Sequence, residues 1–243
     1  AAGDLTIRGV EGAGTTTTGY NRNSGIYLYG DVQLGDTSQT GALNLLANDV
    51  LWPMMATAKM QTTGAVTIAP ISTSFVTEQR MGTNVLLAGT PASLTIGKVG
   101  NTAALNLLTP MSVTGPISLM GGPISLNANL TSTGLISLKS YGGTTGIQQG
   151  LPGLGTPWGI ITAPLVSVTA TNNPVILGND NAIGTVAVTG ASNVRVVNAG
   201  ALTVGSADGV TGISASGTVV AITNTGDLTI ADHIATTSTS AYV

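Results

Sequence analysis

The residues that could perform acid–base or metal chemistry are few in this 243-residue chain. It contains ten Asp and Glu, seven Lys and Arg, one histidine and no cysteine. The histidine, His233, has no second His or Cys with which to form a zinc site of the usual composition. A lone histidine near a chain end is more often an exposed or end-capping side chain than a catalyst. We therefore predict no catalytic residue, no metal site and no cofactor.

The carboxylates are too scattered to form the pairs that carbohydrate-cleaving enzymes use, in which two acids flank the scissile bond. The two closest, Asp227 and Asp232, do not change this conclusion, because Asp227 occupies the same place in a repeated phrase as Asp4. We predict that the chain is not an enzyme, with a carbohydrate-active enzyme as a remote alternative. The acids are Asp4, Glu11, Asp31, Asp36, Asp49, Glu78, Asp180, Asp208, Asp227 and Asp232.

Two polar segments could suggest binding of an ion or of ice. Residues Gly178–Asn181 offer oxygen ligands of the kind calcium prefers, but the nonapeptide of calcium-binding β-rolls is absent. An Asn/Asp-rich turn is the favoured interpretation. Residues Thr15–Thr18 and the Thr-x-Thr spacings could suggest an ice-binding face. Thr alternates with Ser, Asn, Ala and Lys at these positions, which argues against a regular threonine array.

The composition excludes several classes of protein. Only 7% of residues are charged, against about a quarter in average globular domains. Hydrophobic residues reach 42% and the net charge is −3, a combination that does not favour disorder. So few Lys and Arg leave no basic surface for nucleic acid or anionic membranes. No apolar run approaches the roughly 18 residues of a membrane-spanning helix, so we predict neither nucleic-acid binding nor membrane insertion.

A short phrase recurs along the whole chain: a small residue or proline, then alternating aliphatic and small polar residues. Alternation with period two places successive side chains on opposite faces of a β-strand. Examples begin at Gly3, Gly41, Gly64, Ala92, Ala103, Pro116, Pro123, Leu135, Leu165, Gly184, Gly200 and Gly226. Each predicted strand is very short, so none could support a conventional sheet alone.

The spacing of these phrases predicts how the strands stack. The last aliphatic residues of successive phrases recur at a nearly constant interval, from Leu87 to Leu107, Leu107 to Leu126, Leu119 to Leu138 and Leu177 to Val196. A fixed period of this size, about 20 residues, is typical of a solenoid. Because the repeated unit is a strand, we predict a parallel β-helix with coils of about 20 residues, forming one domain over residues 1–243. About a dozen coils at about 4.8 Å each would give a rod of roughly 55 to 60 Å.

A β-sandwich is the alternative fold. Sandwich strands are usually joined by hairpins with Asn-Gly or Asp-Gly turns. The sequence has one Asp-Gly, at Asp208-Gly209, and no Asn-Gly. Gly121-Gly122-Pro123 and Asn172-Asn173-Pro174 suit sharp bends between strands instead, which favours the β-helix.

Two stretches, residues 46–60 and 142–158, interrupt the repeat. We predict that they form excursions from the coils, and such excursions often carry binding function in solenoids. The alternative is that they are tolerated insertions without a role. Their large apolar residues are the candidate interaction residues: Trp52, Met54, Met55, Leu151 and Trp158.

The phrases Gly3–Ile7, Gly41–Leu45 and Gly200–Val204 resemble the repeats of the filamentous haemagglutinin family. These are bacterial exoproteins, similar also to many autotransporter passengers. The resemblance covers nearly the whole chain, but it is a style of repeat rather than a diagnostic motif. It implies a right-handed parallel β-helix exported across a Gram-negative outer membrane and serving in adhesion or cell contact. The family's secretion domain, with its Asn-Pro-Asn-Gly type signature, is not visible, and no functional residue can be carried over.

Two functions follow as hypotheses. The first is a non-catalytic extracellular stalk segment of a larger surface protein. We expect the chain to be such a segment, because Gly3–Ile7 already carries the repeated phrase. The second is a subunit that self-assembles end to end into an extracellular filament. The expected partners are neighbouring coils or further copies, with cell-surface glycans or proteins as additional candidates.

Overall fold

The computed structural model describes residues 3–10, 25–28, 30–52, 57–82, 85–150 and 159–238. In these ranges the regular secondary structure consists of β-strands, without a helix, which confirms the all-β prediction. Twenty of the strands belong to one large sheet, and three further small sheets hold the others. All pairings between described strands are parallel except that of β22 (Ser206–Ala207) with β23 (Val210–Thr211), which is antiparallel.

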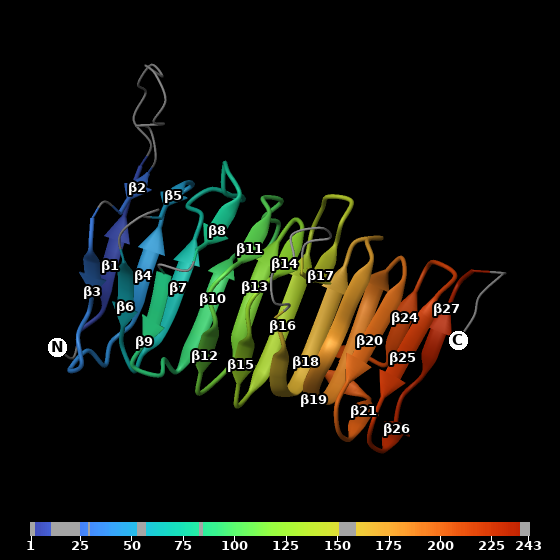
Figure 1. Ribbon diagram of the computed structural model, residues 1–243. Helices are drawn as coiled ribbons and strands as arrows, with labels where there is room; N and C mark the ends of the chain where they lie inside the picture. The colour runs from blue at the N-terminus through green and yellow to red at the C-terminus, as the bar shows by residue number, and fades with distance from the viewer. Residues whose placement is uncertain are drawn as a thin grey trace.

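The strands succeed one another in chain order along the molecule, and the first strand, β1 (Leu5–Arg8), and the last, β27 (Ile234–Thr236), lie towards opposite ends (Figure 1). Through the middle of the chain each strand pairs with the strand three places before it and the strand three places after it. Thus β13 pairs with β10 and β16, β14 with β11 and β17, and β15 with β12 and β18. Consecutive strands therefore belong to different rows, and a row receives a new strand each time the chain returns to it.

The first row is the longest. It comprises β1 (Leu5–Arg8), β4 (Leu43–Leu46), β7 (Ala65–Ala69), β10 (Ser93–Gly97), β13 (Ile117–Gly121), β16 (Leu135–Ser140), β18 (Ile161–Ala170), β19 (Val175–Ala191), β21 (Leu202–Val204) with β24 (Ile213–Ala215), and β26 (Leu228–Ile230) with β27 (Ile234–Thr236).

The other strands form shorter rows. The second row comprises β8 (Gln79–Met81), β11 (Leu105–Leu107), β14 (Ile124–Leu126), β17 (Ile147–Gln149), the start of β19, β20 (Val194–Asn198) and β25 (Val220–Asn224). The third row is in two parts. The first part comprises β3 (Val32–Leu34), β6 (Ala58–Gln61) and β9 (Val85–Ala88). In the second part β12 (Met111–Val113) pairs with β15 (Leu130–Ser132), and β15 pairs with the start of β18. A short pair, β2 (Ile26–Tyr27) and β5 (Val50–Leu51), lies near the N-terminal end.

The core consists of aliphatic side chains aligned from strand to strand. The first row has ten layers, each formed by one strand, except that β21 with β24 and β26 with β27 each form one layer together. One in-register position is aliphatic in all ten layers, and we call it the first inner column. Its eight interior members are at most 2% exposed. The column is Leu5, Leu43, Val66, Leu94, Ile117, Ile136, Val166, Val186, Val204 and Ile230.

A second inner column repeats the pattern two residues further along each strand from β1 to β19, and on the separate strands β24 and β27 in the last two layers. It is aliphatic in every layer as well, because period-two alternation returns the side chain to the same face. The column is Ile7, Leu45, Ile68, Ile96, Leu119, Leu138, Val168, Val188, Ile213 and Ile234. Parallel strands lie about 4.8 Å apart, so aligned aliphatic side chains are in van der Waals contact with the layers on both sides.

The structure tests the predicted spacing directly. Leu107 faces Leu126, Leu119 faces Leu138, and Leu177 faces Val196, as the regular interval between phrases predicted. The predicted pairing of Leu87 with Leu107 is wrong, because the two residues belong to different rows. Leu87 faces Met60, and Leu107 faces Met81. The steps along the first inner column are also unequal. The shortest runs from Val186 to Val204, and the longest, from Leu5 to Leu43, contains about twice as many residues.

These longer steps account for the smaller number of layers. The described first row has ten layers rather than the predicted dozen. At about 4.8 Å per step the row is about 43 Å long, shorter than the roughly 55 to 60 Å expected from the sequence.

A buried member of an inner column should be far more sensitive to truncation than an outward residue on the same row. We predict that Leu138→Ala, at a position with 0% exposure, lowers the free energy of unfolding by about 2 to 5 kcal/mol. The matched control is Leu165→Ala, on the neighbouring strand at 39% exposure, which should cost less than about 1 kcal/mol. Denaturant unfolding measures both values, and equal losses would contradict the assignment of the core.

Candidate functional site

The candidate interaction residues fall largely outside the described part of the chain. Met54, Met55, Leu151 and Trp158 lie there, as does the threonine run Thr15–Thr18. Trp52 is described. It follows β5 directly, is partly buried and packs against the hydrophobic core.

The two stretches predicted as excursions also contribute strands. Within 46–60, the structure places Val50–Leu51 in β5 and Ala58–Met60 in β6, each paired in parallel with another strand. Within 142–158, residues Ile147–Gln149 form β17, which pairs with β14 and β19. Part of each stretch therefore belongs to the sheets, and the excursions stay a prediction for the remainder, much of which lies outside the described residues.

The described residues show no group of three or more His, Cys, Asp and Glu arranged to hold a metal ion. His233 lies beside Gly212, and its backbone oxygen accepts a hydrogen bond from the Ile213 N–H at 2.9 Å. Its imidazole is exposed. Within the part of the chain that the structure describes, no helix is long and apolar enough to cross a membrane.

The segment Gly178–Asn181, predicted as a turn, lies inside the long strand β19, so the prediction of a turn is wrong. The pairing of β19 with β20 shifts register between Leu177 and Asn181. The physical reason is the Asn181 side chain, which is fully buried at this irregularity and supplies the hydrogen bonds that the shifted backbone needs. Its Nδ2 donates to the carbonyl oxygens of Asn179 at 2.8 Å and Val197 at 2.9 Å.

Asn181 belongs to a row of amides that crosses successive layers, which we call the amide ladder: Gln149, Asn181, Asn198 and Asn224. Gln149 Nε2 donates to Asn181 Oδ1 at 2.6 Å, and Asn198 Nδ2 donates to Asn224 Oδ1 at 3.2 Å. Asn181 Oδ1 also accepts from the Ile161 N–H at 2.8 Å, and Asn198 Oδ1 accepts from the Ile183 N–H at 2.7 Å. The amides therefore satisfy backbone groups that the strands leave unpaired where the chain bends.

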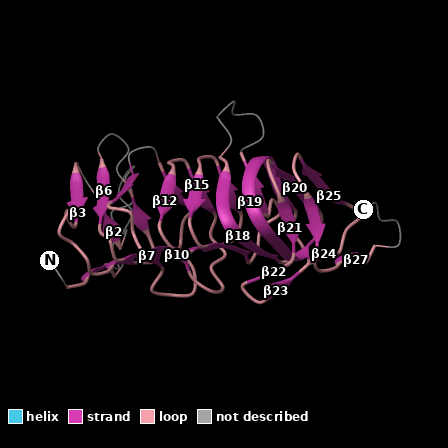
Figure 2. Ribbon diagram, turned by 90° about the horizontal axis from the view of Figure 1, so that it is seen from below, coloured by secondary structure: helices cyan, strands magenta, loops and turns pink. Residues whose placement is uncertain are grey.

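A second feature is a hairpin that covers part of the outer face of the first row. Strands β22 and β23 are joined by Asp208-Gly209, both with positive φ (52° and 75°) as a type I′ turn requires. The hairpin contacts β18 and β19, and it lies along the lower margin of the molecule in Figure 2. Beneath it the outward positions are small and buried: Ser137, Ser167 and Ala187 are in register and at most 4% exposed.

Asp208 fastens this hairpin to the sheet. Its Oδ2 lies 3.1 Å from Lys139 Nζ and accepts a hydrogen bond from Ser137 Oγ at 2.9 Å. Partial burial acts to raise the pKa of this carboxyl, but the Ser137 hydrogen bond and the Lys139 ammonium outweigh it, and the pKa lies below its ordinary value. The contact spans 71 residues of sequence between Ser137 and Asp208, so it ties distant layers together.

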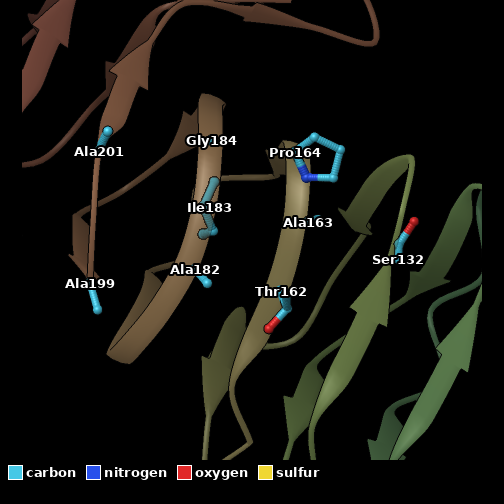
Figure 3. A pocket seen from close by; sticks show the side chains of 9 residues that line it. All are labelled: Ser132, Thr162, Ala163, Pro164, Ala182, Ile183, Gly184, Ala199 and Ala201. Atoms are coloured by element: carbon cyan, nitrogen blue, oxygen red, sulfur yellow. The ribbon is translucent and has the colours of Figure 1, made fainter.

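The third feature is an open groove of about 370 Å³ along the edge where β18 and β19 bend (Figure 3). Its lining is small and mostly apolar, with Ser132 and Thr162 as the only hydroxyls and no ionisable side chain. The lining residues are Ser132, Thr162, Ala163, Pro164, Ala182, Ile183, Gly184, Ala199 and Ala201. Such a surface lacks the convergent polar groups that orient a small-molecule ligand.

In the comparisons with known proteins, no family model, curated protein or solved structure matches the chain. A function must therefore be inferred from the geometry alone. The described residues bring together apolar columns, amides and a fastening hairpin, which are devices that hold layers in place.

We predict that Asn181→Leu lowers the free energy of unfolding by about 3 kcal/mol or more, because it leaves the Ile161 N–H and the Val197 carbonyl buried without a partner. The control is Asn224→Leu, the same chemical change at the less buried end of the amide ladder, with an expected loss of about 1 kcal/mol. Thermal or denaturant unfolding gives both values. A neutral Asn181→Leu variant would show that the amide ladder does not stabilise the stack.

The contact of Asp208 should make stability depend on pH. Because the pKa is lower in the folded state, the carboxylate stabilises the fold above its ordinary pKa of 3.8 and loses this effect as the pH falls through the folded-state value. At pH 7 we expect Asp208→Asn to be less stable than the wild type by under about 1 kcal/mol, because the Asp208 and Lys139 side chains are 33% and 32% exposed and solvent screens the pair. The difference should shrink in unfolding measurements as the pH is lowered below 3.8, and Lys139→Gln should show the same trend. A difference that stays constant from pH 7 to pH 2 would contradict this role.

Proposed function

We propose that the three rows wrap around the inner columns as a right-handed parallel β-helix, and that this stack is a non-catalytic stalk segment of a secreted bacterial surface protein. The pairing of each strand with the third strand before and after it supports the first part. That pattern arises when three strands complete one coil and the next coil stacks upon it. Right-handed crossovers are the strong preference for parallel strands, which gives the hand.

The observation that carries the function is the continuity of the two inner columns through all ten described layers. A single aliphatic core running the length of the stack resists bending at every layer. The amide ladder and the hairpin add contacts between layers. These properties suit a spacer that holds other parts of a protein away from a surface.

The sequence pattern supports an extracellular setting for such a stalk. The strand phrases resemble those of exported haemagglutinin-like repeats, and the chain has no cysteine whose oxidation could interfere with folding outside the cell. With 7% charged residues, solubility rests on Thr, Ser, Asn and Gly at outward positions. Adhesion or cell contact is then a property of the protein to which the stalk belongs.

A display experiment tests the spacer function. The chain is placed between an outer-membrane anchor and a peptide tag, and binding of a bulky antibody to the tag is measured on intact cells. We expect strong binding with the wild-type chain and a loss of at least about fivefold with Leu119→Asp, which puts a charge into the second inner column where the native side chain has 0% exposure. The control is Leu165→Asp on the outer face.

Equal antibody binding to the wild-type and Leu119→Asp fusions, at equal amounts on the surface, would contradict the proposal. The folded stack would then make no difference to how far the tag stands from the membrane.

A further inference from the structure

The backbone of the hairpin formed by β22 and β23 is joined to the stack only at its base. Among the described strands, the two form a sheet of their own, without backbone pairing to β18 or β19 beneath them. At the base, the Gly205 N–H donates to Val186 O at 3.2 Å and the Val188 N–H donates to Gly212 O at 2.9 Å. The Gly212 N–H donates to Gly205 O at 2.8 Å, which closes the base. Residues 206–211 could therefore leave the sheet as one unit while every strand pairing of the first row stays intact.

Few side-chain contacts hold the hairpin against the sheet. Of residues 206–211, only Ala207 is buried, at 5% exposure, so little apolar surface is removed from water. The ion pair of Asp208 described above is partly open to solvent. The other polar contact with the stack, from Ser206 Oγ to Asp232 Oδ2 at 2.9 Å, lies at the surface. Solvent competes for such groups, so these contacts hold the hairpin only weakly.

The outward row of the sheet shows what the hairpin covers. Ser118 and Thr95 lie in register with Ser137 in the two preceding layers, outside the hairpin, and both are partly exposed. Ser137, Ser167 and Ala187, in the layers that the hairpin contacts, are buried, and we call these three residues the covered row. The same kind of small outward side chain is thus exposed or buried according to whether the hairpin lies over it.

The covered row contains a hydroxyl group without a partner. Ser167 is 0% exposed, and its Oγ makes no hydrogen bond with any described residue. Its neighbours in the covered row do not share this problem, because Ser137 Oγ donates to Asp208 and Ala187 has no polar side-chain atom. A hydroxyl that loses water without gaining a partner destabilises the state in which it is buried. If the hairpin left the sheet, Ser167 Oγ would reach water, so this contribution favours an open position.

We propose that the hairpin is a reversible strap, which opens about Gly205 and Gly212 while the stack stays folded and then exposes Ser137, Ser167 and Ala187. Glycine at both ends of the hairpin accommodates the backbone rotation that opening requires, and Gly212 already has a positive φ of 64°. Opening extends the exposed outward row through three further layers. The proposal requires only the described sheet, so its outcome is independent of the proposed stalk function.

Thiol labelling measures the opening, because the chain has no native cysteine. Single cysteines replace Ser167 in the covered row, Val168 in the second inner column of the same strand, and Ser118 in the uncovered part of the outward row. The labelling rate of each folded variant is divided by its rate when unfolded in urea, which removes differences in intrinsic thiol reactivity. We expect Ser118→Cys to be hardly protected and Ser167→Cys to be at least about tenfold less protected than Val168→Cys, because a local opening requires less free energy than unfolding of the stack.

Low concentrations of urea distinguish the two kinds of opening. The effect of urea on an opening reaction scales with the surface that the reaction exposes, and the strap exposes little. We expect the labelling of Ser167→Cys to stay nearly constant below the unfolding transition, while that of Val168→Cys rises steeply. Equal protection at the two positions, or a parallel rise with urea, would overturn the proposal, because the thiol at position 167 would then be reached only when the stack unfolds.

A second probe avoids placing a larger side chain beneath the hairpin. Ala207→Cys puts the thiol on the hairpin itself, at its buried residue. In this background Ser167→Ala should slow labelling about fivefold, because it removes the unpaired hydroxyl. Asp208→Asn should speed labelling about threefold, because it removes the ion pair. The control Ser118→Ala, the same change in the uncovered part of the row, should have no effect. A labelling rate that either Ser167→Ala or Asp208→Asn leaves unchanged would overturn the proposed strap.

Discussion

Burial of aliphatic side chains between successive layers is the interaction on which the rest of the structure depends. A strand of only a few residues cannot bury its apolar face by itself, and neither can one layer of such strands. The inner columns are buried only because each layer has another on both sides, as the exposure of Leu5 and Ile230 at the two ends shows. Stability in such a stack is approximately a sum over layers and their contacts, which is why it can be extended.

This constraint explains why the residue type is restricted at the column positions while the number of residues between layers varies. Column positions remain aliphatic through ten layers, while the length of chain between layers varies about twofold, from the step Val186 to Val204 to the step Leu5 to Leu43. The variable segments run outside the columns and need only return the chain to the correct strand position. At a tight bend this return requires glycine, as at Gly97. Its φ of 81° is unfavourable for other residues, and the nearby Met120 carbonyl oxygen leaves no room for a side chain.

Sequence reasoning recovered the strands whose aliphatic residues alternate clearly, such as β4, β10 and β26, because period two is visible in a single strand. It did not separate the rows, and so it paired Leu87 with Leu107. That information lies in contacts between strands and not within one. Asp208-Gly209 carried the signal of a hairpin, yet nothing local to it indicated that the hairpin would fold onto Ser137 and Lys139, which lie several strands earlier in the chain.

The candidate site was the least predictable part. Large apolar residues in irregular stretches were the available signal, and the one of them that the structure describes, Trp52, packs against the core. Asn181, which connects the layers, was predicted to lie in a turn because the amide side chain is common in turns, and Asn198 was given no role. Their burial could be recognised only once the strands around them were placed, since a buried amide requires the backbone partners that the bend supplies.

The continuous stack of layers is tested most directly by distances between pairs of spin labels on the outer side of the first row. One label is fixed at residue 65 and the second is placed at residue 165, 185, 203 or 229, positions that lie four, five, six and seven layers away. We expect distances that grow by about 4.8 Å per layer, from about 19 Å to about 34 Å. The increments should be equal although the steps differ in sequence length. Distances that follow sequence separation, or that do not increase from one position to the next, would contradict the account.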